Sequence, residues 1–235
     1  MRRLLILLFF ISSLFSAGFV YSQENEAAVP ADSTAYTSPY GLRVGTDLSK
    51  LIRTALENGY SGFEIVSDFR ISDRLYVAAE IGNEKKERFE ANLNSIASGS
   101  YIKVGADYNA YVNWLNMNNA IFVGMRYGLA GFKQELLAYS IYTSNQAFPG
   151  TVRVDPVEYS GLNASWIELM VGVKTEIFHN LFLALNLQLK RKLSDTKPDN
   201  FDNLYIPGFN RTYDFSEFGV GYGYTISYLI PIFKR

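Results

Sequence analysis

The 235-residue chain combines 48% hydrophobic and 15% aromatic residues with a formal net charge of -1 and no cysteine. The lack of cysteine excludes a disulfide framework, a thiolate zinc site, a cysteine nucleophile and a lipid anchor on cysteine. The near-zero charge, without any basic block, argues against nucleic-acid binding, because that affinity depends on neutralising phosphates.

The first segment, 1–22, has the three parts of a secretory signal peptide. Arg2 and Arg3 precede an apolar run, and small residues follow it up to Ser22. Serines interrupt the run, and it is short for a membrane-spanning helix of roughly 20 residues, which favours cleavage over retention as an anchor. We predict that 1–22 is a cleaved signal peptide. The polar, proline-containing stretch 23–39 is predicted to be a flexible N-terminal spacer.

From residue 40 onward the dominant pattern is period-two alternation of apolar and polar residues, which is typical of strands with two unlike faces. In 181–190, for example, leucines occupy every second position, and Asn186, Gln188 and Lys190 lie on the other face. The segments with this pattern are 40–48, 62–71, 74–82, 100–112, 120–132, 165–177, 181–190 and 217–228.

The connections between these segments alternate between short and long. Short turns are predicted at 72–73, 113–119 and 178–180, and the other connections are long. This alternation with an even strand count is the arrangement of outer-membrane barrels, in which apolar residues face outward. We predict an all-β fold for 40–235: an eight-stranded antiparallel up-and-down transmembrane β-barrel. Ten strands are the structural alternative if segments within 133–164 also span, and a soluble barrel with the apolar face inward is the other.

The polar face of the segments carries charges of both signs. The predicted lumen charge network consists of Arg43, Glu64, Asp68, Arg70, Glu80, Lys103, Asp107, Arg126, Glu168, Lys174 and Glu176. Asp47, Lys190 and Glu217 are assigned to the same face. An eight-stranded barrel is only wide enough to be filled by side chains. Because an isolated charge there is costly and pairing removes most of the cost, we expect these residues to form a plug of salt bridges.

Aromatic residues near the strand ends suggest two interfacial girdles. Those expected at the short-turn side are Tyr40, Phe69, Trp114, Phe178, Phe182 and Tyr228, and those at the loop side are Tyr60, Phe63, Phe132 and Trp166.

Motifs for catalysis or cofactor binding are weak. Gly219, Gly221 and Gly223 resemble a dinucleotide loop only superficially, because no helix follows, and we interpret them as a bare lumen face. The one histidine, His179, lies in a short turn and cannot form a multi-histidine metal site. We predict no catalytic residues, metal site or cofactor, and a protein that is not an enzyme.

Two long connections stand out. The mixed-charge run 84–90 is predicted to be a solvated helical turn. Loop 193–216 presents apolar and aromatic residues in a segment expected in water, and its candidate partner-binding residues are Tyr205, Ile206, Phe209 and Tyr213.

The segment Gly221-Tyr-Gly-Tyr-Thr-Ile-Ser-Tyr228 resembles the C-terminal assembly signal of outer-membrane barrels, although residues follow it, so Tyr228 and Phe233 both remain candidates for the last paired aromatic. More broadly, the chain resembles a small outer-membrane β-barrel family of unknown function found in Bacteroidota. The stretches that carry the resemblance are 40–50, 62–68 and 76–83. The resemblance implies a barrel in the bacterial outer membrane and no established catalytic residues.

These features together favour a non-enzymatic outer-membrane barrel that serves as an interaction or accessory subunit and binds a partner through its long external loops. The expected partners are outer-membrane lipids and a surface lipoprotein or a larger outer-membrane complex. A small pore or ligand transporter is the alternative, and a lipid-modifying enzyme is a weaker one.

Overall fold

The computed structural model describes residues 40–90, 92–111, 119–140, 152–199 and 201–233, all within one compact unit, Thr37–Arg235. The predicted signal peptide, 1–22, and spacer, 23–39, lie outside the described residues. The long strands are β1 (Tyr40–Asp47), β2 (Tyr60–Arg70), β3 (Leu75–Glu90), β4 (Leu93–Tyr111), β5 (Ala120–Ser140), β7 (Val157–Phe178), β8 (Leu181–Asp195) and β11 (Phe218–Phe233). The shorter elements are α2 (Leu48–Leu56), β6 (Val152–Arg153), β9 (Tyr205–Ile206) and β10 (Asn210–Arg211).

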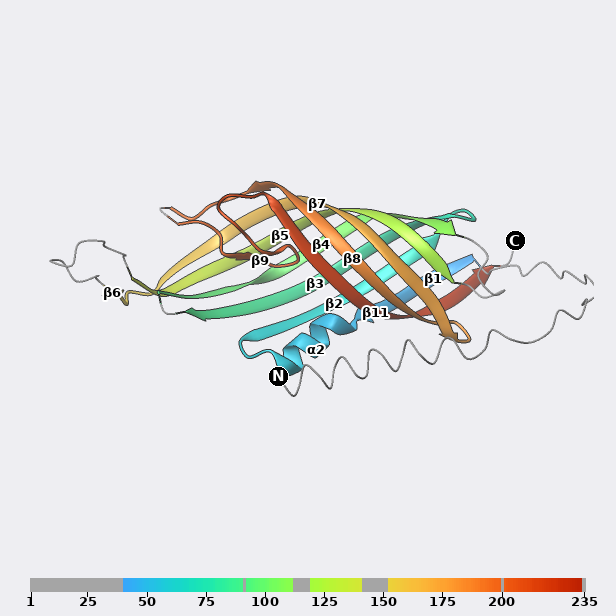
Figure 1. Ribbon diagram of the computed structural model, residues 1–235, viewed down its shortest axis with the longest axis horizontal. Helices are drawn as coiled ribbons and strands as arrows, with labels where there is room; N and C mark the ends of the chain where they lie inside the picture. The colour runs from blue at the N-terminus through green and yellow to red at the C-terminus, as the bar shows by residue number, and fades with distance from the viewer. Residues whose placement is uncertain (1–39, 91, 112–118, 141–151, 200, 234–235) are drawn as a thin grey trace, which may run out of the picture. The chain divides into compact units, whose positions relative to one another are not determined.

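The eight long strands form a closed antiparallel ring. Their order is β4-β3-β2-β1-β11-β8-β7-β5, and the pairing of β4 with β5 closes it. Figure 1 shows these strands side by side and strongly tilted. The predicted eight-stranded up-and-down fold is confirmed. The ten-strand alternative is wrong, because the two-residue β6 pairs with β5 alone and β9 and β10 form a separate small sheet.

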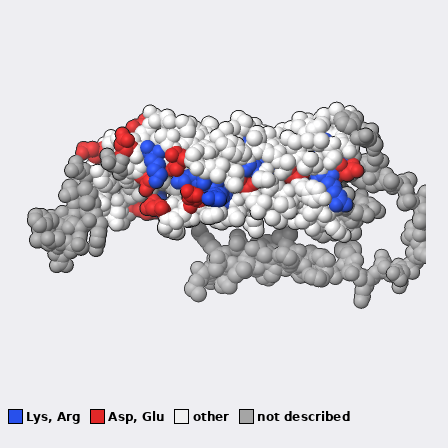
Figure 2. Space-filling model, turned by 90° about the horizontal axis from the view of Figure 1, so that it is seen from above, with Lys and Arg blue, Asp and Glu red and all other residues white. Residues whose placement is uncertain are grey.

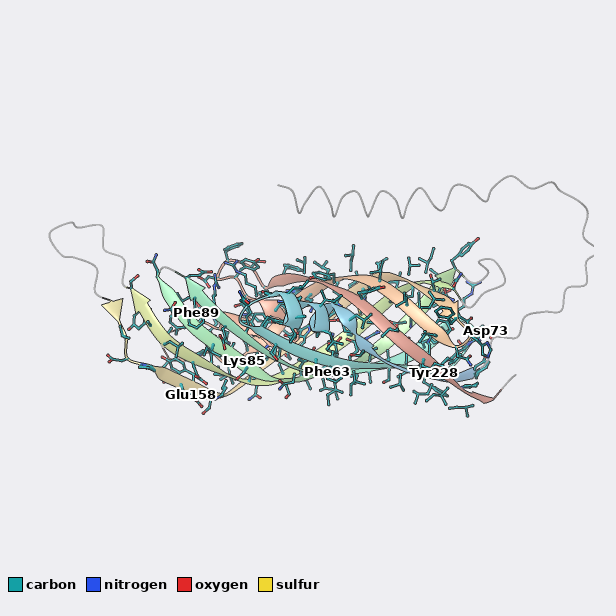
Figure 3. The ribbon with its side chains drawn as sticks, turned by 90° about the horizontal axis from the view of Figure 1, so that it is seen from below. Phe63, Asp73, Lys85, Phe89, Glu158 and Tyr228 are labelled. Carbon is teal, nitrogen blue, oxygen red and sulfur yellow. The ribbon has the colours of Figure 1, made fainter. Side chains whose placement is uncertain are left out.

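The apolar face of the strands points out of the ring. On β8, Leu187 is 71% exposed, whereas Asn186 and Gln188 beside it are buried in the lumen. Phe63 of β2 likewise points away from the ring in Figure 3. Figure 2 shows one face with a largely uncharged central surface and most of its charged side chains toward the end where the long hairpins lie. A soluble barrel that buries its apolar face is therefore not the arrangement adopted.

The outward apolar residues form a band around the ring, and four strands continue beyond it at one end. On β3 the outward positions are apolar from Leu75 to Ile81 and then polar at Asn83, Lys85 and Glu87. We call the described parts beyond the band, 83–90 and 92–100 on β3 and β4 and 131–140 and 157–165 on β5 and β7, the projecting hairpins. Phe89, Lys85 and Glu158 lie on them in Figure 3, at the end opposite Asp73 and Tyr228.

The helical turn predicted for 84–90 is wrong. This run continues β3, and its residues pair with β4, as in the pairs of Glu87 with Ile96 and Glu90 with Leu93. Pairing with a neighbouring strand satisfies the backbone there, and both faces are polar because both lie outside the apolar band. Within 133–164, β5 continues beyond the apolar band and Tyr139 and Ser140 pair with β6, whereas 141–151 lies outside the described residues.

The predicted girdles are wrong for five residues that point into the lumen and are buried there, namely Tyr40, Tyr60, Phe132, Trp166 and Phe182. Phe63, Phe178 and Tyr228 are exposed on the outer face, Phe69 is half-buried, and Trp114 lies outside the described residues. Glycines on facing strands make room for the inward rings. A Cβ at Gly128 would overlap the Trp166 indole, and one at Gly172 would lie 2.6 Å from the Phe122 ring.

Strand β11 confirms the interpretation of its glycines as a bare lumen face. A Cβ at Gly219, Gly221 or Gly223 would crowd the side chains of Phe209, Gln188 or Asn186, respectively, at 2.7 to 3.0 Å. The strand does not end at Tyr228. Its pairing with β1 continues to the Cα partners Phe233 and Tyr40, which answers the question of the last paired aromatic.

Helix α2 connects β1 to β2 and packs against β2 and β11. Its N-terminus is capped by Asp47, whose carboxylate accepts a hydrogen bond from the Ser49 amide at 2.8 Å. The cap orients the first turn so that Lys50 is buried in the mouth of the ring. No helix among the described residues is long and apolar enough to cross a membrane.

Replacing Gly128 with Ala is expected to destabilise the fold by about 1–3 kcal/mol, because the added methyl group overlaps Trp166. The matched control is Gly131→Ala, where the nearest atom, Asn163 Oδ1, lies 3.7 Å from the added Cβ. Urea unfolding of the refolded chain in detergent measures both variants. Equal midpoints for the two variants would contradict the packing described.

Candidate functional site

Among the residues that the structure describes, fifteen charged residues are buried in the lumen, and they are almost balanced in sign. The basic residues are Arg43, Lys50, Arg70, Lys103, Arg126, Lys174 and Lys190, and the acidic residues are Asp47, Glu64, Asp68, Glu80, Glu84, Asp107, Glu168 and Glu176. All eleven residues of the predicted network are among them. Glu217 is not, because β11 begins one residue later; it is exposed and lies 3.7 Å from Arg191 on the outside.

Near the short turns, Asp68 of β2 joins two cations from different strands. The Arg43 Nε donates to Asp68 Oδ1 at 2.6 Å, and the Lys174 Nζ reaches Asp68 Oδ2 at 2.6 Å from β7. The Arg43 guanidinium also lies over the rings of Tyr76 and Phe182, at 4.6 and 5.2 Å from their centres. This cluster connects β1, β2 and β7 through the interior.

Arg70 and Glu176 lie at the edge of the same end. The Arg70 guanidinium donates to Asp73 in the β2–β3 turn at 3.2 Å and lies over the Tyr40 ring at 4.6 Å. Glu176 accepts a hydrogen bond from the backbone amide of Asn180 in the β7–β8 turn at 2.8 Å. Both residues thus help to hold the short turns in place at this end of the ring.

The centre of the lumen is organised by Lys103 of β4 and Arg126 of β5. The Lys103 ammonium contacts Glu80, lies 3.2 Å from Glu64 and approaches Glu168 at 3.8 Å. The Arg126 guanidinium binds Asp107 through two hydrogen bonds of 2.7 and 3.0 Å and donates to Glu80 at 3.0 Å. Such bidentate, charge-assisted bonds are strong and geometrically specific.

Glu168 links this centre to the upper lumen. Its Oε1 accepts a hydrogen bond from the Trp166 indole at 2.7 Å and lies 3.3 Å from the Lys190 ammonium. Its Oε2 has no hydrogen-bond partner among the described residues and relies on Lys103. The Tyr101 hydroxyl donates to Glu64 at 2.6 Å. Aromatic hydroxyl and indole groups therefore complete the pairing of carboxylates that lysines only partly satisfy.

At the opposite end from the short turns, the mouth is closed by the segment 205–211, which we call the cap hairpin and which contains β9 and β10. The hairpin and α2 converge on Glu84 of β3. Glu84 pairs with Lys50 and accepts hydrogen bonds from the hydroxyls of Tyr60 and Tyr205, at 3.0 and 2.7 Å, and from the Gly208 amide at 3.0 Å. One carboxylate thus holds the helix, the cap hairpin and the strand together.

The apolar residues of the cap hairpin are buried rather than presented to water. Ile206 and Phe209 pack with Tyr101 and Trp166, and the rings of Trp166 and Phe209 meet edge to face at 6.0 Å. The exposure expected for Tyr205, Ile206 and Phe209 is therefore wrong, whereas Tyr213 is exposed. The reversal at Gly208, whose φ is 81°, turns the hairpin back into the mouth, and Gly219 leaves space for the Phe209 ring.

Three important residues were missed by the sequence prediction. Glu84 continues the inward parity of Glu64 and Glu80 into the segment wrongly predicted as a helical turn, so that parity was a usable signal. Lys50 reaches Glu84 only because α2 packs over the mouth of the ring. Gln134, fully buried, accepts from the Leu204 amide at 2.9 Å and donates to the Asp202 carbonyl at 3.1 Å. Local sequence gives no sign of either contact, because each partner lies far away in the chain.

Two cavities lined by described lumen residues are small. One cavity below α2, lined by Lys50, Glu64 and Lys103 among others, has a volume of about 60 Å³. Another near Asp68 and Arg126 has about 40 Å³. These volumes suit single waters rather than a substrate. In the part of the chain that the structure describes, no group of three or more histidine or carboxylate residues is arranged to hold a metal ion.

A family model described as a domain of unknown function, DUF6048, matches residues 2–235. The chain belongs to the DUF6048 family. No curated protein matches the sequence. The prediction that the chain belongs to a family of unknown function is thus confirmed. That the family is located in the outer membrane and occurs in Bacteroidota remains a prediction.

In this DUF6048 protein, Glu84 lies beyond the apolar band, buried beneath the cap hairpin at the mouth of the ring. Burial by itself would raise the pKa of Glu84, but the Lys50 ammonium, the Gly208 amide and the Tyr205 hydroxyl outweigh it and lower the pKa to about 2. The carboxylate is therefore charged throughout the ordinary pH range, and the cap hairpin is held at neutral pH.

Lys103→Met is expected to destabilise the fold by about 3–5 kcal/mol, because it leaves Glu64, Glu80 and Glu168 buried with too few cations. The matched control is Lys85→Met on the outer face of a projecting hairpin, for which a change of less than about 0.5 kcal/mol is expected. Urea unfolding in detergent measures both. A Lys103 variant as stable as the Lys85 variant would show that the lumen charges do not depend on one another.

The attachment of the cap hairpin should depend on pH in one direction. Because the pKa of Glu84 falls from an ordinary 4.5 to about 2, the stability that it contributes is fully present above pH 4.5 and is lost as the pH falls toward 2. Hydrogen exchange of a peptide covering 205–211, corrected for intrinsic rates, should be slow from pH 8 to 5 and faster at pH 2.5. Glu84→Gln should exchange quickly at pH 7, and slow exchange there would contradict the role of Glu84.

Proposed function

We propose that this protein is a sealed, non-enzymatic outer-membrane β-barrel, exported by a cleaved signal peptide, that acts as an interaction or accessory subunit and offers its projecting hairpins to a partner. The observation that carries the proposal is the division of the ring into an apolar outer face and a lumen of paired charges. The resemblance to a Bacteroidota outer-membrane barrel family points to the same location.

The outer face supports a location in a bilayer. Large apolar side chains such as Leu185, Leu187 and Val220 are more than half exposed and follow one another around the band. Soluble monomers rarely expose continuous apolar patches of more than a few hundred Å², whereas the lipid-facing surface of a membrane barrel requires them.

The difference between the two ends of the ring supports an orientation of the protein in the membrane. Short turns such as 179–180 join the strands at one end, and the projecting hairpins extend the strands at the other. Outer-membrane barrels place short turns in the periplasm and long connections outside the cell. The projecting hairpins and the connection 196–217 would then face the exterior, where a surface lipoprotein or a larger outer-membrane complex can reach them.

The filled lumen favours an interaction role over transport. The cap hairpin closes the mouth, and Lys103, Arg126 and Lys174 bridge the interior below it. Carboxylates paired in this way are neutralised by neighbouring cations, which is a structural use of such groups rather than an arrangement for acid–base chemistry. Function is therefore expected on the projecting ends.

Cell fractionation tests the location directly. The full-length chain expressed in a Gram-negative host should appear in the outer membrane without residues 1–22, and it should migrate faster in gels when it is not boiled, as closed barrels do. A soluble periplasmic protein without heat-dependent migration would refute the proposal.

Planar-bilayer recording distinguishes the sealed barrel from a pore. The purified protein should give no stable conductance at pH 7, because ion pairs span the lumen. Reproducible open channels of the unmodified protein would favour the transporter alternative instead.

Photo-crosslinking in intact cells tests the interaction role. A benzophenone amino acid replaces Phe89, exposed on a projecting hairpin, or Phe178, exposed at the short-turn end as the matched control. Phe89 should give a discrete protein adduct that Phe178 does not give. Adducts at neither position, or only at Phe178, would contradict partner binding through the projecting hairpins.

A further inference from the structure

A polar pocket lies outside the lumen, between the two arms of the connection from β8 to β11. One wall is formed by residues from Lys192 to Asn203 and the other by residues from Thr212 to Glu217. Its volume is about 300 Å³, at the lower end of the roughly 300–1,000 Å³ typical of small-molecule sites. The pocket is therefore large enough for a single small ring and is far larger than the lumen cavities.

Within this pocket one buried acceptor lacks a partner. Asn203 is 3% exposed, and its amide nitrogen donates to Asp195 Oδ2 and to the Thr196 carbonyl, both at 2.9 Å. These two bonds fix the orientation of the amide, which leaves Oδ1 without a hydrogen-bond partner among the described residues. Buried polar atoms in native proteins are usually satisfied, so an orphaned acceptor on a residue that lines a pocket points to a ligand that donates a hydrogen bond.

Two aromatic rings form the rim of the same pocket. Tyr213 and Phe215 lie 5.5 Å apart with a 43° angle between their planes, and Phe215 is 88% exposed. An isolated β-bridge between Tyr213 and Ser216 closes the turn that carries both rings. An apolar ring face beside a polar pocket fits a ligand that has both an apolar face and polar groups at its edge.

The charge of the pocket narrows the class of ligand that it fits. Four acidic residues, Asp195, Asp202, Asp214 and Glu217, line it against the two lysines Lys192 and Lys197. The lysines are already paired, with Asp195 at 3.1 Å and Asp202 at 2.7 Å. Asp214 has no hydrogen bond or salt bridge among the described residues, and its charge acts on Lys197 only at longer range. The free groups are thus acceptors, which repel anionic ligands and attract hydroxyl donors.

We infer that this pocket binds a neutral saccharide, with one pyranose ring stacked on Phe215 and its hydroxyl groups donating to Asn203 Oδ1 and the Asp214 carboxylate. A pyranose has an apolar C–H face and donor hydroxyls around its edge, which matches the rim and the interior of the pocket. Saccharide binding goes beyond the proposed function and requires neither a protein partner nor a sealed lumen.

Saturation-transfer NMR on the full-length chain in detergent micelles tests the proposal. The probes are glucose, galactose, mannose and N-acetylglucosamine, with glucuronate and glucose 6-phosphate as anionic probes and lysine amide as a cationic one. At least one neutral sugar should bind, and the anionic sugars should bind more weakly. Failure of all four neutral sugars, or binding of lysine amide alone, would overturn the proposal.

Single substitutions test whether the sugar binds in this pocket. Phe215→Ala should weaken binding of the neutral sugar about tenfold or more, because a stacked ring is lost. Asp214→Asn, which keeps the shape of the side chain, should restore part of the binding of anionic sugars. Phe89→Ala removes another exposed phenyl group, which lies on a projecting hairpin outside the pocket, and is the matched control. Equal affinity of the Phe215 and Phe89 variants would overturn the assignment to this pocket.

Discussion

The structure depends on ion pairing inside a closed eight-stranded ring. Lumen side chains in such a ring have little water, so each charge must find an opposite charge within reach. The partners come from across the lumen rather than from the adjacent strand alone: Lys174 of β7 meets Asp68 of β2, and Lys103 of β4 approaches Glu168 of β7. Buried pairs do not add much net stability, but the loss of one partner is costly, and this dependence favours a single arrangement of the strands.

The same constraint explains how the mouth closes. The cations Lys50 and Lys190 extend the pairing upward, and Lys190 donates to the carbonyl of Gly208 at 2.6 Å. The cap hairpin is therefore attached through polar contacts with Glu84 and Lys190 as well as through the packing of Ile206 and Phe209. A lumen whose charges almost balance and whose mouth is closed leaves the outer ends of the strands, and the connection above them, as the surfaces proposed for binding.

The ring itself was predictable because alternation is strong wherever one face meets an apolar environment. The alternation that places Ile167 and Leu183 on the outer face also places their neighbours Trp166 and Phe182 on the inner face. The girdle prediction failed because it used only the position of each aromatic residue along its strand and not the face of the strand on which it lies. Tyr40 is different, since a register irregularity beside it changes its face. Beyond the apolar band, as in 83–90, both faces are polar and the alternation ends although the hydrogen-bonded ladder continues. The cap hairpin could not be predicted, because its contacts join residues more than a hundred positions apart, such as Tyr205 and Glu84.

The central claim is that the apolar outer residues face lipid around a filled interior of paired charges, and the lack of native cysteine allows a direct measurement. Single spin labels on Leu187→Cys and Asn186→Cys, adjacent on β8 but on opposite faces, are compared in reconstituted bilayers. Asn186 pairs with Gly223 of β11, where the side chain at 186 meets no opposing side chain from its direct partner. The label at 187 should be accessible to oxygen and protected from a water-soluble nickel chelate, and the label at 186 should be protected from both. Access of the nickel chelate to either label would contradict the account.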